Sequence, residues 1–280
     1  LNPNEKIVRA YVIEKFREDL FFVLISKRGQ IKRLSLQDFS VVRYSKPLIC
    51  MKLLSDDELA DVAFTDGDSN LMIFTSDGNA TFYNENELPA AGMRSGGVKG
   101  ISKLGSAEII NIIAYPKDKV EGKVCLITDK ACIRIYDPNK TALVTRLGKP
   151  SQVFKSFKSD EHKLVYAFKL DTSIEKNSLH FLNNMKEIQD IEVNDYHLTP
   201  MDYYCHESVN IGKKNRLEIA FIEGRDRILA NTESHARVIP EEEKVKEEEV
   251  VGQVPSKKEE EDEPVNGYTQ ISIFDDDDED

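Results

Sequence analysis

The repetition of one hairpin-like segment constrains the fold of this chain more than any other sequence feature. In residues 20–39 (LFFVLISKRGQIKRLSLQDF) a short apolar run reaches a tight turn at Gly29, and a second short run follows. Two such runs around a glycine turn predict a β-hairpin. The same pattern recurs in residues 70–88, 123–143 and 178–196. The turn position holds, in order, Gly29, Gly78, Ala131 and Lys186, and we expect the last two turns to differ because they lack glycine.

Strand-like segments surround the hairpins, and no segment between them has the period of a helix. We expect these strands at residues 7–13, 48–54, 59–64, 101–104, 109–114, 163–168 and 216–222. A unit of about 50 residues and four strands, present four times, predicts an all-β, propeller-like fold. The expected blades lie near residues 1–64, 65–115, 116–170 and 171–228. Stacking buries the two apolar faces that one blade leaves open, and a β-sandwich or barrel is the alternative fold.

Acidic residues are concentrated at the C-terminal end of the chain. The formal net charge is −12, but 17 acidic residues and only 4 lysines lie from Glu241 onward. The rest of the chain is close to neutral, so it can still carry a basic rim that attracts nucleic acid. Residues 229–280 have few apolar side chains to bury, and we expect them to form an acidic, mostly disordered tail.

The sequence gives little sign of a membrane segment, a metal site or an active site. No apolar run approaches the ~20 residues that a membrane helix needs, and no signal peptide is evident. The four cysteines form no Cys-x-x-Cys pair, and we expect reduced thiols in a cytosolic protein. His197, Cys205 and His206 fit no common zinc spacing, so we expect no metal. No nucleophile triad or phosphate-binding loop is found, and the first residue, Leu1, suggests a piece of a longer protein.

The repeat, the basic glycine hairpin and residues 94–100 (RSGGVKG) together resemble a known family. They are similar to the C-terminal DNA-wrapping domain of type IIA topoisomerase A subunits, the family of gyrase A and its paralogue in topoisomerase IV. The resemblance covers nearly all of residues 1–222 and is strongest in the first two repeats. It implies a β-pinwheel, a propeller-like fold whose strands are exchanged between neighbouring blades.

A basic box distinguishes the two members of this family. Gyrase A carries the pattern Gln-Arg-Arg-Gly-Gly-Lys-Gly, which its strong DNA wrapping requires. The sequence here lacks the leading Gln-Arg and keeps Arg94, Gly96, Gly97, Lys99 and Gly100. A degenerate box favours the A subunit of topoisomerase IV, with gyrase A as the alternative.

Basic side chains at hairpin tips are the candidates for DNA contact, because they can neutralise successive phosphates without reading bases. Besides the five box residues, the candidates are Lys27, Arg28, Lys32, Arg33, Arg43, Lys46, Lys103, Arg134, Arg146, Lys149, Lys155, Lys213, Lys214 and Arg216. We expect the box glycines to let backbone amides approach phosphate. The alternatives are that these cations only protect a solvated strand edge, or that the blades form a protein-binding scaffold.

The resemblance also implies what lies outside this chain. The holoenzyme passes one DNA segment through another, with magnesium and with ATP bound on a separate B subunit, and so serves decatenation and supercoil relaxation in chromosome segregation. Its catalytic tyrosine lies in an N-terminal domain of the A subunit, in a motif that contains none of Tyr11, Tyr44, Tyr83, Tyr203 and Tyr204. We therefore expect a non-catalytic domain that binds no cofactor itself. The expected partners are duplex DNA, a second copy of the A subunit, and the B subunit, and the expected location is the bacterial cytoplasm at the nucleoid.

The acidic tail has two interpretations that do not exclude each other. It can fold back on a basic rim and act as a DNA mimic. Within it, Gln270, Ile271, Ser272, Ile273 and Phe274 are similar to the Gln-Leu-Ser-Leu-Phe peptide that binds the bacterial replication clamp. A short apolar anchor on a flexible arm suits a hydrophobic groove, so the clamp is a further expected partner.

Overall fold

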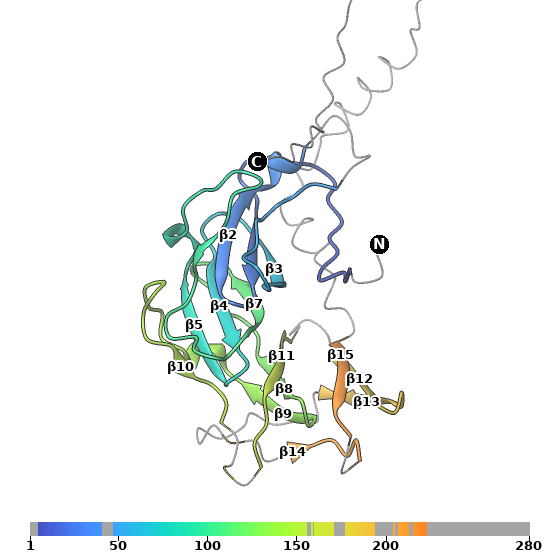
Figure 1. The fold of residues 1–280 in the computed structure, drawn as a ribbon. Coiled ribbons are helices and arrows are strands. Elements are labelled where there is room, and N and C mark those ends of the chain that lie inside the picture. Colours follow the sequence, from blue (N-terminus) through green and yellow to red (C-terminus); the bar gives the residue numbers. More distant parts are fainter. Residues whose placement is uncertain are drawn as a thin grey trace, which may run out of the picture. The chain divides into compact units, whose positions relative to one another are not determined.

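The fold of the described residues is all-β, as the sequence predicted. The computed structural model describes residues 5–40, 47–155, 158, 160–170, 177–193, 204, 207–212 and 215–222. Within these ranges the regular elements are β-strands and three short 3₁₀ helices, arranged in four antiparallel sheets (Figure 1).

Each repeat contributes three strands to its own sheet. The first sheet has β1 (Phe21–Ser26), β2 (Gln30–Ser35) and β3 (Leu59–Thr65), and the second has β4 (Asn70–Thr75), β5 (Asn79–Asn84) and β7 (Ile109–Tyr115). The third has β8 (Val124–Thr128), β9 (Cys132–Tyr136) and β11 (Leu164–Lys169), and the fourth has β12 (Ser178–Asn183), β13 (Ile188–Glu192) and β15 (Leu217–Ile222). The 3₁₀ helices η1 (Leu36–Phe39), η2 (Glu85–Glu87) and η3 (Pro138–Lys140) follow the first three hairpins.

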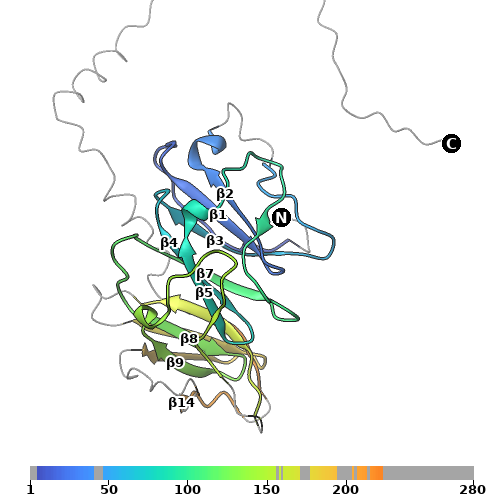
Figure 2. The same ribbon diagram turned by 90° about the vertical axis from the view of Figure 1, so that its left-hand side faces the viewer.

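The first three sheets receive a fourth strand from the next repeat. The two-residue strand β6 (Val98–Lys99) pairs with β2, and β10 (Ser151–Gln152) pairs with β5. In the third sheet, β14 (Glu207–Ser208) pairs with β9 (Figure 2). Each donated strand follows the hairpin of the next repeat in sequence. The strand exchange expected of a β-pinwheel is therefore confirmed, and the sandwich and barrel alternatives are wrong. The fourth sheet has three strands within the described ranges.

The four hairpin turns share one conformation, so the expectation that the last two differ is wrong. The backbone φ is 83° at Gly29, 82° at Gly78, 57° at Ala131 and 64° at Lys186. In every turn the amide of this residue donates to the carbonyl three residues earlier, at 2.9–3.0 Å. A side-chain oxygen at that earlier position accepts the amide four residues on; these side chains belong to Ser26, Thr75, Thr128 and Asn183. This second bond holds the turn where glycine is absent.

Three of the expected strands are not strands. Residues 7–13, 48–54 and 101–104 are irregular. Tyr11 instead donates its hydroxyl to the carbonyl of Val62 at 2.5 Å, and its ring packs on Phe22. Ile101 is buried against the turn at Gly29, where a Cβ would lie 3.3 Å from it. The apolar character of these segments serves packing, which a sequence pattern cannot distinguish from strand pairing.

The hydrophobic core lies between successive sheets. One cluster joins Val23 and Ile25 of the first sheet to Leu71 and Ile73 of the second. A second cluster joins the second and third sheets, and a third cluster joins the third and fourth. Neighbouring repeats therefore bury each other's faces, as the stacking argument predicted.

The described cysteines differ from the expectation of reduced thiols. Cys50 and Cys125 are free, and complete burial raises the pKa of the Cys125 thiol to about 12. Cys132 is disulfide-bonded, so the expectation is wrong for this residue; its partner lies outside the described ranges.

Several sequence expectations fall on residues that the structure does not describe. These are the tail at residues 229–280 with its segment 270–274, and the residues His197, Cys205 and His206. In the described part, no group of metal-ligating side chains is found, and no helix is long and apolar enough to span a membrane.

Candidate nucleic-acid interface

Some of the candidate cations lie on the surface. Arg28, Arg94, Lys99, Lys103, Lys149 and Lys155 are exposed, and Arg146 is half-buried. Lys27 is half-buried and forms an ion pair with Glu58 at 2.8 Å, which raises the pKa of the lysine. Arg216 pairs with Asp129 at 2.5 Å. Arg43, Lys46, Lys213 and Lys214 lie outside the described residues.

Two candidates are buried, so the expectation that they face solvent is wrong. Lys32 and Arg134 are each 2 % exposed. The ammonium of Lys32 donates to the carbonyls of Cys50 at 2.7 Å and Ser95 at 3.1 Å, and Arg134 donates to the carbonyl of Tyr204 at 3.1 Å. Strand alternation places a side chain in solvent only where one sheet face is open, and here the chain of the next repeat covers that face.

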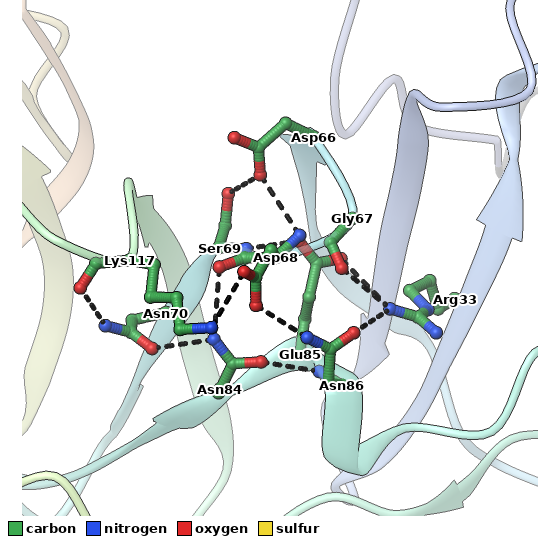
Figure 3. Close-up of polar contacts among 10 residues, drawn as sticks. All are labelled: Arg33, Asp66, Gly67, Asp68, Ser69, Asn70, Asn84, Glu85, Asn86 and Lys117. Carbon is green, nitrogen blue, oxygen red and sulfur yellow. Dashed lines mark hydrogen bonds and ion pairs between the residues drawn. The ribbon is translucent and has the colours of Figure 1, made fainter.

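Arg33 is held in a polar network between the first two repeats (Figure 3). Its guanidinium donates to the carbonyl of Gly67 at 3.2 Å and to Asn86 Oδ1 at 3.3 Å, and it lies 3.8 Å from Glu85. Glu85 is fully buried and accepts from the Thr65 hydroxyl and the Ser69 amide, both at 2.7 Å. Burial raises the pKa of the Glu85 carboxyl. Arg33 is therefore engaged in joining two sheets.

Two of the three box glycines are required for close packing. A Cβ on Gly97 would lie 2.7 Å from the carbonyl oxygen of Ile31, and one on Gly100 would lie 2.8 Å from the Ile31 side chain. The Gly100 amide is already donated to the carbonyl of Gly29 at 2.8 Å. Both glycines let β6 close on β2, and for Gly100 the expectation of an amide available to phosphate is wrong. Gly96 is exposed and meets only the Lys52 carbonyl, at 3.7 Å.

Three connecting segments lack acidic residues, a charge pattern that the prediction from the hairpins missed. Residues 39–55, 88–107 and 138–159 contain no Asp or Glu, although acidic residues make up 50 of the 280. Each of these basic connections joins a hairpin to the third strand of its repeat. Their cations are Arg43, Lys46, Lys52, Arg94, Lys99, Lys103, Lys140, Arg146, Lys149, Lys155 and Lys158. The corresponding connection of the fourth repeat contains Asp195, Asp202 and Glu207.

Lys52, Lys140 and Lys158 are the cations of this set that the sequence analysis did not select. All three are exposed. These three lysines do not lie at hairpin tips, and the prediction from the sequence considered mainly cations at or near those tips. Lys52, Lys140 and Lys158 could have been predicted from the sequence, because the connections that contain them have no acidic residues.

The basic connections contact each other directly. The Arg94 amide donates to the carbonyl of Ile49, and the Lys52 amide donates to the carbonyl of Ser95, each at 3.1 Å. The second and third connections meet where the Ser102 hydroxyl donates to the Gly148 carbonyl at 2.7 Å. A carboxylate borders this surface, since Glu87 accepts the amide of Arg146 at 2.6 Å. The three connections are therefore hydrogen-bonded in series, and we call their exposed cations the cationic surface, a charge pattern suited to a polyanion.

Comparison with known proteins identifies the repeats. The family model described as "DNA gyrase C-terminal domain, beta-propeller" matches residues 21–66 and 69–115. The chain is 27 % identical over 165 residues to the A subunit of DNA topoisomerase 4 from Staphylococcus epidermidis, covering 59 % of this chain and 20 % of the relative. It is 30 % identical over 151 residues to the A subunit of DNA gyrase from Haemophilus influenzae, covering 52 % of this chain and 17 % of the relative. The chain thus spans about a fifth of the length of the curated relatives it matches.

Solved structures agree on the fold. A crystal structure of the C-terminal domain of DNA topoisomerase IV superposes with a TM-score of 0.71 at 22 % identity, covering 85 % of this chain and 73 % of that one. A structure of the DNA gyrase A C-terminal domain gives a TM-score of 0.60 at 14 % identity, covering 74 % of this chain and 67 % of that one. The chain is a strand-exchanged, propeller-like β-repeat protein with a cationic surface. Its first two repeats match the model of the DNA gyrase C-terminal domain family, and the resemblance inferred from the sequence is confirmed.

Proposed function

We propose that the chain is the DNA-binding and DNA-bending C-terminal domain of the A subunit of a topoisomerase IV. The observation that carries this proposal is the run of three basic connections, in successive repeats, without one acidic residue. Their hydrogen bonds to each other give a duplex a continuous path across three repeats. Phosphate contacts of this kind give affinity without base recognition and weaken steeply with salt.

The path ends before the fourth repeat. Asp195, Asp202 and Glu207 interrupt the connection there, so phosphates would meet carboxylates. We therefore place DNA on the first three repeats. Since the pattern of contact recurs from repeat to repeat, the duplex has to bend to follow it, and the bending energy is offset by the added contacts.

The role follows from the relatives named above, two kinds of topoisomerase A subunit. In our proposal the domain presents a DNA segment to a catalytic core that lies elsewhere in the protein. Strand passage would use ATP on a B subunit with magnesium, and the chain itself would be non-catalytic and bind no cofactor. Its further partners would be a second copy of the A subunit, and the B subunit. Its location would be the bacterial cytoplasm at the nucleoid.

Topoisomerase IV is preferred over gyrase because the basic box lacks its leading Gln-Arg. Gyrase wraps DNA strongly with one handedness. The change in linking number of a plasmid relaxed by a nicking-closing enzyme in the presence of the chain therefore distinguishes the two proteins. A large linking-number change would favour gyrase A, and a small one topoisomerase IV.

The direct test is fluorescence anisotropy with a duplex of about 40 base pairs over a salt series. We expect binding whose logarithm falls linearly with the logarithm of the salt concentration, with a slope of several units. A lack of binding at low salt would overturn the proposal. The alternative would then be a protein-binding scaffold, which the exposed Met185, Ile188, Ile219 and Phe221 of the fourth repeat favour.

The tail proposals are tested separately. If the acidic tail competes with DNA, replacing its acidic residues with amides tightens duplex binding; unchanged affinity would contradict this. If residues 270–274 bind the replication clamp, the chain displaces a known clamp peptide, and the Phe274→Ala variant does not. The absence of displacement at high micromolar concentration would end the clamp proposal.

A further inference from the structure

Lys32 is a buried cation beneath the cationic surface. It lies on β2, and its ammonium donates to one carbonyl on each of two basic connections, Cys50 on the first and Ser95 on the second. The two connections touch at the same place, where the Lys52 amide also donates to the Ser95 carbonyl. A single side chain thus fixes both segments against one strand.

The chemistry of this contact is unusual for a buried charge. Buried ammonium groups are normally paired with a carboxylate. Among the described residues no carboxylate lies within ion-pair distance of Lys32, whose polar partners are the carbonyls of Cys50 and Ser95. Burial lowers the pKa of this lysine. A salt-bridged lysine would bring a negative charge beneath the surface, whereas carbonyl partners leave the local field positive.

Arginine occupies the equivalent position in the third repeat and makes one equivalent contact. Arg134 lies three residues after Ala131, as Lys32 lies three residues after Gly29. It donates to the carbonyl of Tyr204, three residues before β14, and Lys32 donates to the carbonyl of Ser95, three residues before β6. Two equivalent positions therefore hold a buried cation that fastens the donated segment of the next repeat.

The other two repeats show what happens without a cation. Thr81 occupies the position in the second repeat, and its buried hydroxyl has no hydrogen-bond partner among the described residues. The equivalent carbonyl, that of Gly148, is satisfied by Ser102 instead. In the fourth repeat Gln189 occupies the position and donates its amide to the carbonyl of Asn210 at 3.1 Å. In three of the four repeats this position therefore holds a long side chain that donates to a backbone carbonyl of a connecting segment.

We propose that Lys32 is a positioning residue for DNA binding, which holds the first and second basic connections in one layer so that Lys52, Arg94 and Lys99 face the same duplex. This inference rests on the proposed function. Lys32 would not touch phosphate itself. Its removal would take this donor from the Cys50 carbonyl and leave the Ser95 carbonyl with the Lys52 amide alone. The two connections would then be held less firmly, so that several phosphate contacts weaken together.

The test compares Lys32→Met with Lys32→Arg in the full chain. We expect Lys32→Met to weaken duplex binding by about tenfold or more at 100 mM salt and to lower the salt slope by more than the ~0.9 of a single phosphate contact. Lys32→Arg should bind DNA within about threefold of the parent, because arginine already occupies the equivalent position of the third repeat. If Lys32→Met does not fold, Lys32→Gln replaces it, since Gln189 occupies the equivalent position.

The matched control is Arg134→Met. It removes the equivalent contact below a segment that contains Glu207, outside the proposed DNA path. We expect the DNA affinity of Arg134→Met to stay within about twofold of the parent, because a change far from the DNA path acts independently of it. Equal losses of affinity in Lys32→Met and Arg134→Met would show a general effect on the fold and would overturn the inference, as would an unchanged salt slope in a folded Lys32→Met.

Hydrogen exchange separates failure of this inference from failure of the proposed function. Lys32→Met should speed exchange of the amides in residues 94–100, whether or not DNA binds. If neither the parent nor any variant binds DNA, the proposed function is wrong. The role of Lys32 in DNA binding is then wrong as well. If the parent binds DNA but Lys32→Met neither exchanges faster nor binds more weakly, only the positioning role is wrong.

Discussion

The carboxylate of Asp61 accepts the backbone amide of Ile112 at 3.1 Å and thereby links the third strand of the first repeat to that of the second. The link recurs one repeat later, where Asn111 Oδ1 accepts the amide of Ala167 at 2.8 Å. Both acceptors hold the same register, opposite Ile25 and Phe74. Sheets that pack through apolar clusters are therefore also aligned by a side chain that reaches the neighbouring backbone.

Asp61 should be essential for the stability of the first repeat. It is 2 % exposed and also accepts the guanidinium of Arg9, at 2.5 and 2.9 Å. We expect Asp61→Ala to lower the free energy of unfolding by about 3–5 kcal/mol, because buried partners lose their acceptor. Asp61→Asn should lose less, since Asn111 makes the equivalent bond with an amide. Urea unfolding measures both, and equal losses would show that the Arg9 charge, not the Ile112 amide, is what matters.

The turn at Lys186 offers a stabilising substitution. Lys186 has a left-handed φ of 64°, which for a side chain other than glycine costs about 1–2 kcal/mol. Its ion pair with Glu218 is exposed and contributes little. We expect Lys186→Gly to raise the free energy of unfolding by about 0.5–1 kcal/mol, after the greater freedom of glycine in the unfolded chain is counted. Thermal unfolding should show a higher midpoint.

The contrasting variant is Gly78→Ala. A Cβ there would lie 2.3 Å from the backbone oxygen of Phe154, so the donated segment must move. We expect a loss of at least about 2 kcal/mol, from backbone strain and overpacking together. If Gly78→Ala were tolerated and Lys186→Gly were destabilising, the common turn conformation of the four repeats would be contradicted.

Stability should depend on pH through Glu85. Its carboxyl, ordinarily with a pKa near 4.5, has a raised pKa because it is buried, although Thr65, Ser69 and Arg33 partly oppose the shift. A raised folded-state pKa means that this group stabilises the fold fully below the unfolded pKa, and that this contribution is lost as the pH rises through the folded pKa. We expect the stability of Glu85→Gln relative to the parent to improve from about pH 4.5 to neutral pH.

Urea unfolding at several pH values between these limits measures the difference in unfolding free energy between Glu85→Gln and the parent. The contributions of most other carboxyl groups cancel in this difference. Glu85→Gln keeps an acceptor for only one of the Thr65 and Ser69 donors, so it should be less stable than the parent at the acidic end. A difference that stays flat with pH, or moves the other way, would show that the interaction with Arg33 outweighs burial.

The sequence predicted the part of the fold that is encoded locally. Each hairpin is a contiguous pattern of two apolar runs and a turn, and all four were found. The donated strands β6, β10 and β14 could not be found in this way, because each is two residues long and pairs with a strand of the preceding repeat. The family resemblance, not a local pattern, supplied the expectation of strand exchange.

The candidate site was predictable in charge but not in exposure. Lys32 and Lys99 are both strand lysines close in sequence to a glycine, yet Lys32 is buried under the chain of the next repeat and Lys99 is exposed. Only the folded arrangement separates them. The acid-free connections were readable in the sequence, but their significance depends on the hydrogen bonds that bring them together, such as that between Arg94 and Ile49.

Exposed lysines of the basic connections should each account for about one unit of the salt dependence of DNA binding. Lys99 and Lys103 are exposed, and none of the described carboxylates lies within ion-pair distance of either. We expect Lys99→Gln and Lys103→Gln each to lower the slope of log K against log salt by about 0.9, and the double variant by about twice that. Lys117→Gln is the control, because Lys117 is exposed but pairs with Asp68 at 2.9 Å and lies outside the connections. Anisotropy titrations at four salt concentrations measure the slopes. If Lys117→Gln lowered the slope as much as Lys99→Gln, the DNA would not follow the basic connections.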